Sequence, residues 1–148
     1  MTVRIQTDDF DAGFELKQLR LQRSDTGAIV SFIGQVRDLN DDKDVTHLTL
    51  EHYPEMTEKA LQAIIQKAQA SWDIFDALII HRVGLLKPTE QIVMVAVTSA
   101  HRGEAFHACE FIMDYLKTEA PFWKKEQGKT GSRWVEAKES DNAAKLRW

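Results

Sequence analysis

The sequence predicts an α+β protein in which helices pack on a largely antiparallel sheet. Segments with strand-like alternation outnumber the helical segments, and helices do not strictly alternate with them along the chain. The chain has 148 residues, of which 43% are hydrophobic and 28% charged. That size and balance are typical of one ordinary globular domain, so we expect a single domain over residues 1–148.

In the first half of the chain, the clearest strand is 27–36, where Gly34 interrupts an apolar face and predicts a bulge or a close approach. The alternating segment 46–53 is expected to pair with it as a hairpin across the polar loop 37–44. The other predicted elements are a strand at 3–6, a helix at 10–20 with Asp8 or Asp9 as N-cap, and a helix at 56–71.

In the second half, the segment 91–99 is apolar on both faces and is expected to be central in the sheet. A long helix should follow, with Ser99 as its cap and its end near Glu119, because Pro121 disfavours helical geometry at the residue before it. Its apolar stripe is predicted to contain Ala105, Phe106, Cys109, Ile112, Met113 and Leu116. The remaining predictions are a strand at 75–83, turns at 84–88 and 128–132, an extended segment at 122–126, a strand at 133–137 and a helix at 141–148.

Composition excludes several functional classes. The net charge of −4 is unlike that of a general nucleic-acid coat, which needs a basic surface. The longest apolar run, 92–97, is too short to span a bilayer, and the N-terminus lacks an apolar signal region, so we expect a cytoplasmic protein that binds neither nucleic acid nor membrane. The single cysteine, Cys109, excludes an intrachain disulfide and is expected to be buried.

Common catalytic motifs are absent from the sequence. There is no HExxH, CxxC or carboxylate cluster, and His107 and Cys109 should point to different faces of their helix, so neither a metal nor a cofactor is expected. The segment GKTGS at 128–132 follows no apolar strand, which argues against a phosphate loop. Ser31 and Ser99 lack the GxSxG context of a nucleophile.

Basic residues instead mark both ends of the long helix. His101 and Arg102 lie at its start, where free N–H groups favour an anion; Lys117 lies in its last turn, and Lys124 and Lys125 follow. Taken singly, each is better explained as a solvated charge, a helix cap or protection of a sheet edge. His101 and Lys117 are sixteen residues apart, roughly 24 Å along a helix, so one anion site using both requires two chains.

With these residues assembled, the chain resembles the family of molybdopterin synthase catalytic (large) subunits. The resemblance covers nearly the whole chain and is carried by FIGQVR at 32–37, LTLEHYPEMTEKAL at 48–61, IIHRVG at 79–84, VTSAHR at 97–102, FIMDYLKTEAPFWKKE at 111–126 and RWVEAKES at 133–140.

This resemblance implies a fold of the α/β-hammerhead kind and a sulfur-transfer activity. The family converts cyclic pyranopterin monophosphate (precursor Z) to molybdopterin by forming a dithiolene. Its sulfur donor is the C-terminal glycine thiocarboxylate of a small ubiquitin-like subunit, whose tail enters a pocket of the large subunit. The implied assembly is a heterotetramer built on a central homodimer of large subunits.

The family's pocket carries over onto Gln35, Val36, Arg37, His101, Arg102, Lys117, Lys124, Lys125 and Glu126. Lys117 and Lys124 match the lysines to which catalysis is attributed, and His101 and Arg102 match positions supplied by the neighbouring large subunit. The alternative is a non-catalytic module that accepts a partner's extended tail beside a sheet edge. A phosphate-ester hydrolase is disfavoured because the sequence offers no metal set or nucleophile–base pair.

Overall fold

The computed structural model covers residues 1–148 and describes all of them except 41–42, 45, 129–130 and 136–138. Its first sheet has the strand order β1-β6-β8-β2. The bounds are β1 (Thr2–Gln6), β6 (Asp76–Arg82), β8 (Gln91–Ser99) and β2 (Ala28–Gln35). Only the β1–β6 pair is parallel in this sheet.

A second, fully antiparallel sheet lies at one end of the first, with the order β10-β9-β5-β7. Its strands are β10 (Gly131–Val135), β9 (Phe122–Gly128), β5 (His47–His52) and β7 (Gly84–Leu86). A two-stranded ribbon of β3 (Leu39–Asn40) and β4 (Lys43–Asp44) accompanies it. The predicted α+β class with largely antiparallel pairing is confirmed.

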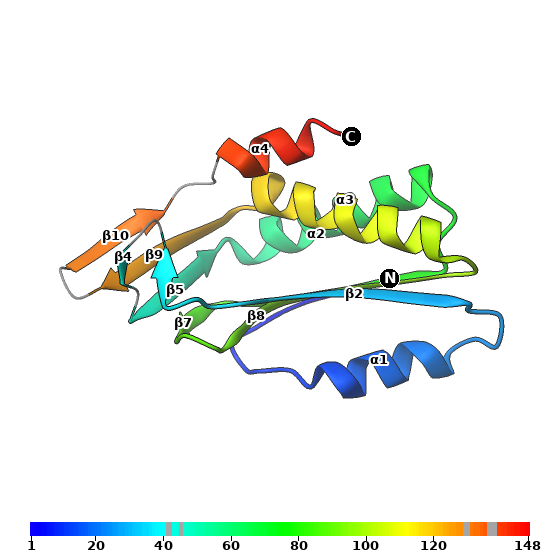
Figure 1. Cartoon of the computed structure of the whole chain (residues 1–148), viewed down its shortest axis with the longest axis horizontal. Coiled ribbons are helices and arrows are strands. Elements are labelled where there is room, and N and C mark those ends of the chain that lie inside the picture. The colour runs from blue at the N-terminus through cyan, green and yellow to red at the C-terminus, as the bar shows by residue number, and fades with distance from the viewer. Residues whose placement is uncertain (41–42, 45, 129–130, 136–138) are drawn as a thin grey trace.

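Helices cover both faces of the first sheet (Figure 1). The helix α1 (Ala12–Leu21) lies on one face, and α2 (Pro54–Ser71) and α3 (Arg102–Glu119) lie on the other. The short helix α4 (Glu139–Lys145) packs on α3. Among the described residues, no helix is long and apolar enough to cross a membrane.

The core follows this layering. The largest buried cluster joins α2 and α3 to the first sheet and contains Leu61, Ile79, Val95 and Ile112. Leu78, Ile80 and Met94 point to the other face, where they pack against α1. Leu48, Leu50 and Leu86 of the second sheet form a third cluster with Val36, which follows β2.

The α3 helix matches its prediction closely. It ends at Glu119, two residues before Pro121, and it buries Ala105, Cys109, Ile112 and Leu116. Phe106 is an exception to the predicted stripe, because it is 58% exposed. Ser99 is not the N-cap either: that position is His101, and the Ser99 hydroxyl accepts the His101 N–H at 3.4 Å while donating to the Asp73 carbonyl.

Strand pairing departs from the sequence prediction at two places. The expected hairpin between 27–36 and 46–53 is wrong, because β2 pairs with β8 in the first sheet and β5 pairs with β7 and β9 in the second. The expected turn at 84–88 begins instead with the strand β7. The bulge predicted at Gly34 is confirmed by a register shift between Gly34 and Gln35.

Smaller differences concern element ends. The first helix starts at Ala12, with the Asp11 carboxylate accepting the Phe14 N–H as the N-cap, so neither Asp8 nor Asp9 fills that position. The last helix covers Glu139–Lys145 rather than 141–148. The predicted loop 37–44, turn 128–132 and strand 133–137 each lie partly outside the described residues.

Candidate active site at the junction of α3 and β9

The two candidate catalytic lysines lie on either side of a short link between α3 and β9. Lys117 is exposed in the last turn of α3, and Lys124 is half-buried near the start of β9. Between them the chain turns at Pro121, where the Phe122 N–H donates to the Ala120 carbonyl at 2.8 Å. This bond closes a three-residue turn of the γ type.

The register of β9 separates its charged side chains onto two faces. Lys124 pairs with Leu50 and Glu126 with Leu48 across the β5–β9 ladder, and directly opposite residues share a face. Leu48 and Leu50 are buried, and Glu126 is itself only 4% exposed. Lys124 and Glu126 therefore lie on the inner face of the second sheet.

Lys125 points the other way. It alternates with Lys124 and Glu126 along β9, and its ammonium lies 5.6 Å from the centre of the Trp134 ring on β10. The resemblance assigns all three residues to one pocket, and the register places the Lys125 side chain on the other face of β9 from those of Lys124 and Glu126.

The bulge at the end of β2 brings a second chain segment to the inner face. Val36 is buried in one cluster with Leu48 and Leu50, and its N–H donates to the Glu90 carbonyl at 2.9 Å. Gln35 and Arg37 flank it and are both exposed. Leu48 and Leu50 of this cluster pair with Glu126 and Lys124 of β9. The predicted segment 35–37 therefore lies near β9 at Val36.

The opposite end of α3 is far from these lysines. His101 and Arg102 are exposed at the start of the helix, which runs through 18 residues to Glu119. Arg102 and Lys117 are fifteen residues apart, roughly 22 Å along the axis. The structure therefore does not bring His101 and Arg102 to Lys117 within one chain.

His81 also lies in this region, although it was not among the site residues predicted from the sequence. Its ring stacks on Phe122 with centroids 3.8 Å apart and planes at 16°. Burial lowers the pKa of His81 from 6.5 to about 4, with the positive charges of Lys117 and His52 acting in the same direction. The available signal was a titratable residue that alternates with the apolar Ala77 and Ile79 on one face of β6.

Cys109 is buried in α3, and burial raises the pKa of its thiol to about 11, so it is a packing residue. Among the residues that the structure describes, no three His, Cys, Asp or Glu side chains are grouped as metal ligands would be.

Comparison with known proteins decides the family. A family model described as MoaE protein matches residues 5–119. The chain belongs to the MoaE family. The molybdopterin synthase catalytic subunit of Ralstonia nicotianae is 60% identical over 147 residues, which cover 99% of this chain and 84% of that protein.

Solved structures agree with this assignment. The MoaE protein of Burkholderia ambifaria is 55% identical and has a TM-score of 0.85, with 99% of this chain and 97% of that chain covered. A molybdopterin synthase structure from Staphylococcus aureus is 31% identical and has a TM-score of 0.82, with 89% and 95% covered. Lys117 lies within the range of the MoaE model, whereas Lys124 and Glu126 lie beyond it, in the part covered by these individual relatives.

Proposed function

We propose that this chain is the catalytic subunit of a molybdopterin synthase. It would convert cyclic pyranopterin monophosphate to molybdopterin with sulfur from the C-terminal thiocarboxylate of a small ubiquitin-like subunit. Membership of the MoaE family supports the proposal. The observation that carries it is the position of Lys117 and Lys124 on either side of one fixed turn, with Lys124 on the inner face of β9.

The proposed chemistry brings two anions together, a cyclic phosphate and a thiocarboxylate. In each transfer the thiocarboxylate sulfur bonds to a side-chain carbon whose oxygen leaves, as water or as the opened phosphate ester. Water then cleaves the acyl carbon–sulfur bond and leaves the donor tail as a carboxylate. Lys117 is proposed to transfer protons or stabilise the developing oxyanion, and Lys124 to bind the anion. Arg37 and Arg102 can hold a phosphate through paired hydrogen bonds, and His101 lies beside Arg102.

Val36, Gln35 and Glu126 complete the proposed pocket. Val36 and Glu126 are buried on the side of the second sheet where Lys124 lies, and Gln35 lies at the bulge that leads to Val36. Lys125 stays in the proposed set as the resemblance gives it, and its side chain lies on the opposite face of β9 beside Trp134.

The donor subunit is the proposed protein partner, and the cytoplasm is the proposed compartment. A buried free cysteine such as Cys109 is compatible with a reducing environment. Cell fractionation with an antibody against the chain tests the compartment, and recovery outside the cytoplasm would refute it.

Reconstitution tests the activity. The purified chain is mixed with thiocarboxylated small subunit and cyclic pyranopterin monophosphate, and the products are analysed for a dithiolene pterin. The wild-type chain should form it, whereas the small subunit alone should not. Unchanged precursor in the presence of a correctly folded, partner-bound chain would contradict the proposal.

We further propose that each site is shared by two copies of this chain. The separation of roughly 22 Å between Arg102 and Lys117 along α3 supports this, because both can serve one pocket only if they come from different protomers.

Subunit mixing tests the shared site. Arg102→Ala and Lys117→Ala chains, each inactive alone, are co-expressed. In a mixed dimer one site then keeps both residues, so random pairing should restore about a quarter of wild-type activity. A mixture as inactive as its parents would show that the two residues act within one chain.

A further inference from the structure

The link Ala120–Phe122 sets how Lys117 and Lys124 are placed relative to each other. The two lysines are seven positions apart and lie on different elements, α3 and β9. Movement of the link would therefore change the separation of their ammonium groups. A displacement of about 1 Å in a catalytic group can cost about a hundredfold in rate.

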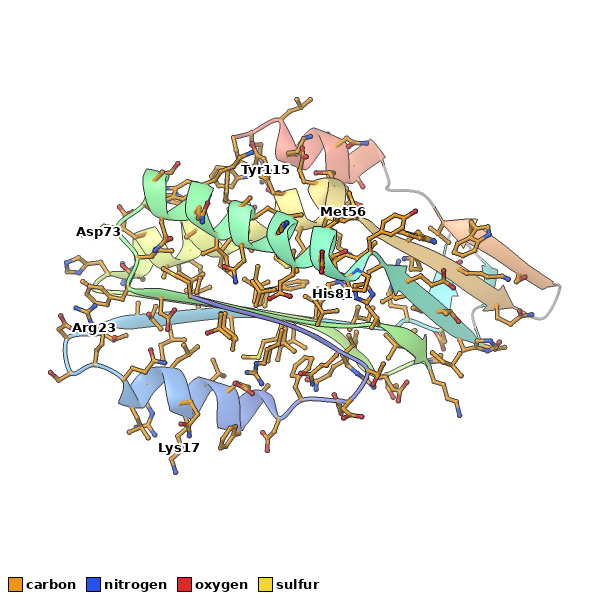
Figure 2. All side chains as sticks on the ribbon, turned by 180° about the vertical axis from the view of Figure 1, so that it is seen from behind. Lys17, Arg23, Met56, Asp73, His81 and Tyr115 are labelled. Atoms are coloured by element: carbon orange, nitrogen blue, oxygen red, sulfur yellow. The ribbon has the colours of Figure 1, made fainter. Side chains whose placement is uncertain are left out.

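Two buried side chains from other elements hold this link. Thr57, fully buried in the first turn of α2, donates its hydroxyl to the Pro121 carbonyl at 3.3 Å. His81, only 5% exposed, lies near the end of β6 beneath α2 (Figure 2). It supports the Phe122 ring by the stacking described above. The link is therefore held from α2 and from the first sheet.

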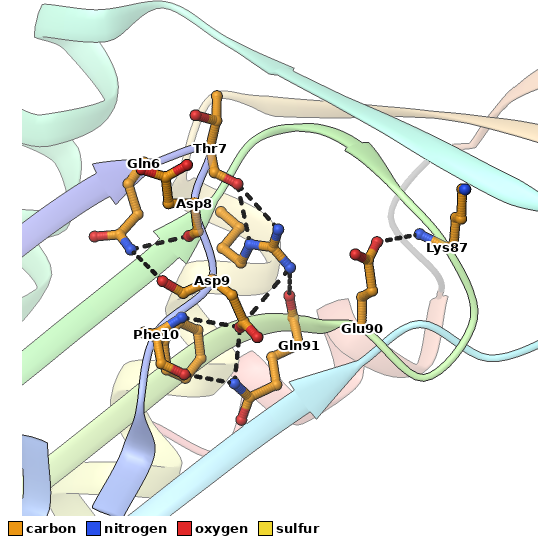
Figure 3. Close-up of polar contacts among 9 residues, drawn as sticks. Gln6, Thr7, Asp8, Asp9, Phe10, Lys87, Glu90 and Gln91 are labelled. Carbon is orange, nitrogen blue, oxygen red and sulfur yellow. Dashed lines mark hydrogen bonds and ion pairs between the residues drawn. The ribbon is translucent and has the colours of Figure 1, made fainter. Parts of the chain in front are cut away.

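The His81 ring is itself firmly anchored. Its Nδ1–H donates to the Arg82 carbonyl at 2.8 Å, and the buried Arg82 guanidinium donates to the carbonyls of Thr7 and Gln91 at 3.0 Å. The Gln91 amide in turn donates to the Asp9 carboxylate at 2.9 Å (Figure 3). Hydrogen bonds to two other segments of the chain, at Thr7 and at Gln91, thus fix the strand end that carries the ring.

The charge state of His81 also matters for the site. Burial keeps the pKa of His81 near 4, and the positive charges of Lys117 and His52 oppose its protonation. The ring is therefore neutral at neutral pH. An imidazolium at this position would repel Lys117 and would be a buried charge.

We propose that His81 is a positioning residue for sulfur transfer: its neutral ring, stacked on Phe122, fixes the Ala120–Phe122 link and thereby the placement of Lys117 relative to Lys124. This inference rests on the proposed function, which supplies the reaction. It assigns a role to a residue outside the set expected from the family.

Reconstituted turnover of three proteins tests the role of the ring. His81→Ala removes the ring, and His81→Phe keeps a flat ring for stacking. His81→Ala should lower kcat by about 10- to 100-fold. The KM for the thiocarboxylated small subunit should stay within about twofold, because the docking surface is unchanged. His81→Phe should recover most of the lost kcat.

A matched control separates positioning from general destabilisation. Ile80→Ala removes a fully buried side chain from the same strand on the face toward α1, so it should lower stability without lowering kcat. If His81→Ala does not fold, Phe122→Leu removes the stacking from the other side and should give the same loss of kcat.

The inference is overturned if His81→Ala, or Phe122→Leu in its place, keeps wild-type kcat. It is also overturned if His81→Phe is as slow as His81→Ala, or if Ile80→Ala loses kcat equally. These outcomes differ from failure of the proposed function, in which the wild-type chain itself forms no dithiolene.

Discussion

Burial of neutral His81 makes the stability of this protein depend on pH. The folded-state pKa of His81 is about 4, whereas its ordinary value is 6.5. Between these values the unfolded chain binds a proton that the folded chain excludes, so the free energy of unfolding falls as the pH falls. The stabilisation is fully present above about pH 6.5 and is lost progressively down to about pH 4.

The magnitude follows from the difference between the two pKa values. They differ by about 2.5, and one pKa unit corresponds to about 1.4 kcal/mol, so the full effect is about 3 kcal/mol. About 2 kcal/mol of it should already be lost between about pH 7 and about pH 5.

Urea unfolding of the wild-type protein and His81→Phe at these two pH values measures the effect, with the four tryptophans as the fluorescent probe. The remaining titrating groups are present in both proteins, so their contributions cancel in the comparison. The wild-type protein should lose about 2 kcal/mol more than the variant on acidification. Equal losses in the two proteins would refute the assignment of a buried, neutral His81.

Three further predictions concern α3. Lys117→Ala should lose most turnover and still bind the small subunit, and near-normal turnover would remove Lys117 from catalysis; Lys117→Arg keeps the charge, so retained activity would exclude a neutral-amine role. Ile112→Ala opens a cavity at a fully buried site and should lower the free energy of unfolding by about 2–5 kcal/mol in urea, whereas a loss below about 1 kcal/mol would contradict the packing. Cys109, with its pKa raised to about 11, should resist iodoacetamide in the native protein and react in urea by mass spectrometry; rapid native labelling would show that the site opens.

The parts of the fold that were predicted correctly depend on local sequence rules. Pro121 ends α3 at the expected place, the apolar run in β8 marks an interior strand, and Gly34 marks a bulge. In each case the cause lies within a few residues of the effect, so the sequence alone is sufficient.

The errors have non-local causes. The segments of β2 and β5 read as a hairpin, but β2 pairs with β8, about sixty residues further along the chain, and that choice depends on the competing partners. The helical spacing of apolar residues predicts that Phe106 is buried, but it lies at the margin of the buried stripe and faces solvent.

The candidate site was predictable as a set of residue types, not as an arrangement. The resemblance indicated Lys117 and Lys124, and the length of α3 separated Arg102 from them. The fact that Lys125 faces away from Lys124 and Glu126 follows only from the register of β9 with β5. The packing of His81 on Phe122 joins positions 41 residues apart, so no local pattern could reveal it.

The most direct measurement of the central claim counts sulfur. In the reconstituted reaction, thiocarboxylated small subunit consumed and dithiolene pterin formed are quantified together by mass spectrometry. A catalytic subunit should consume two thiocarboxylates for each dithiolene, and Lys117→Ala should consume few while still binding the partner. If the chain binds the small subunit but leaves its thiocarboxylate intact, it is a docking module and the proposed catalytic function is wrong.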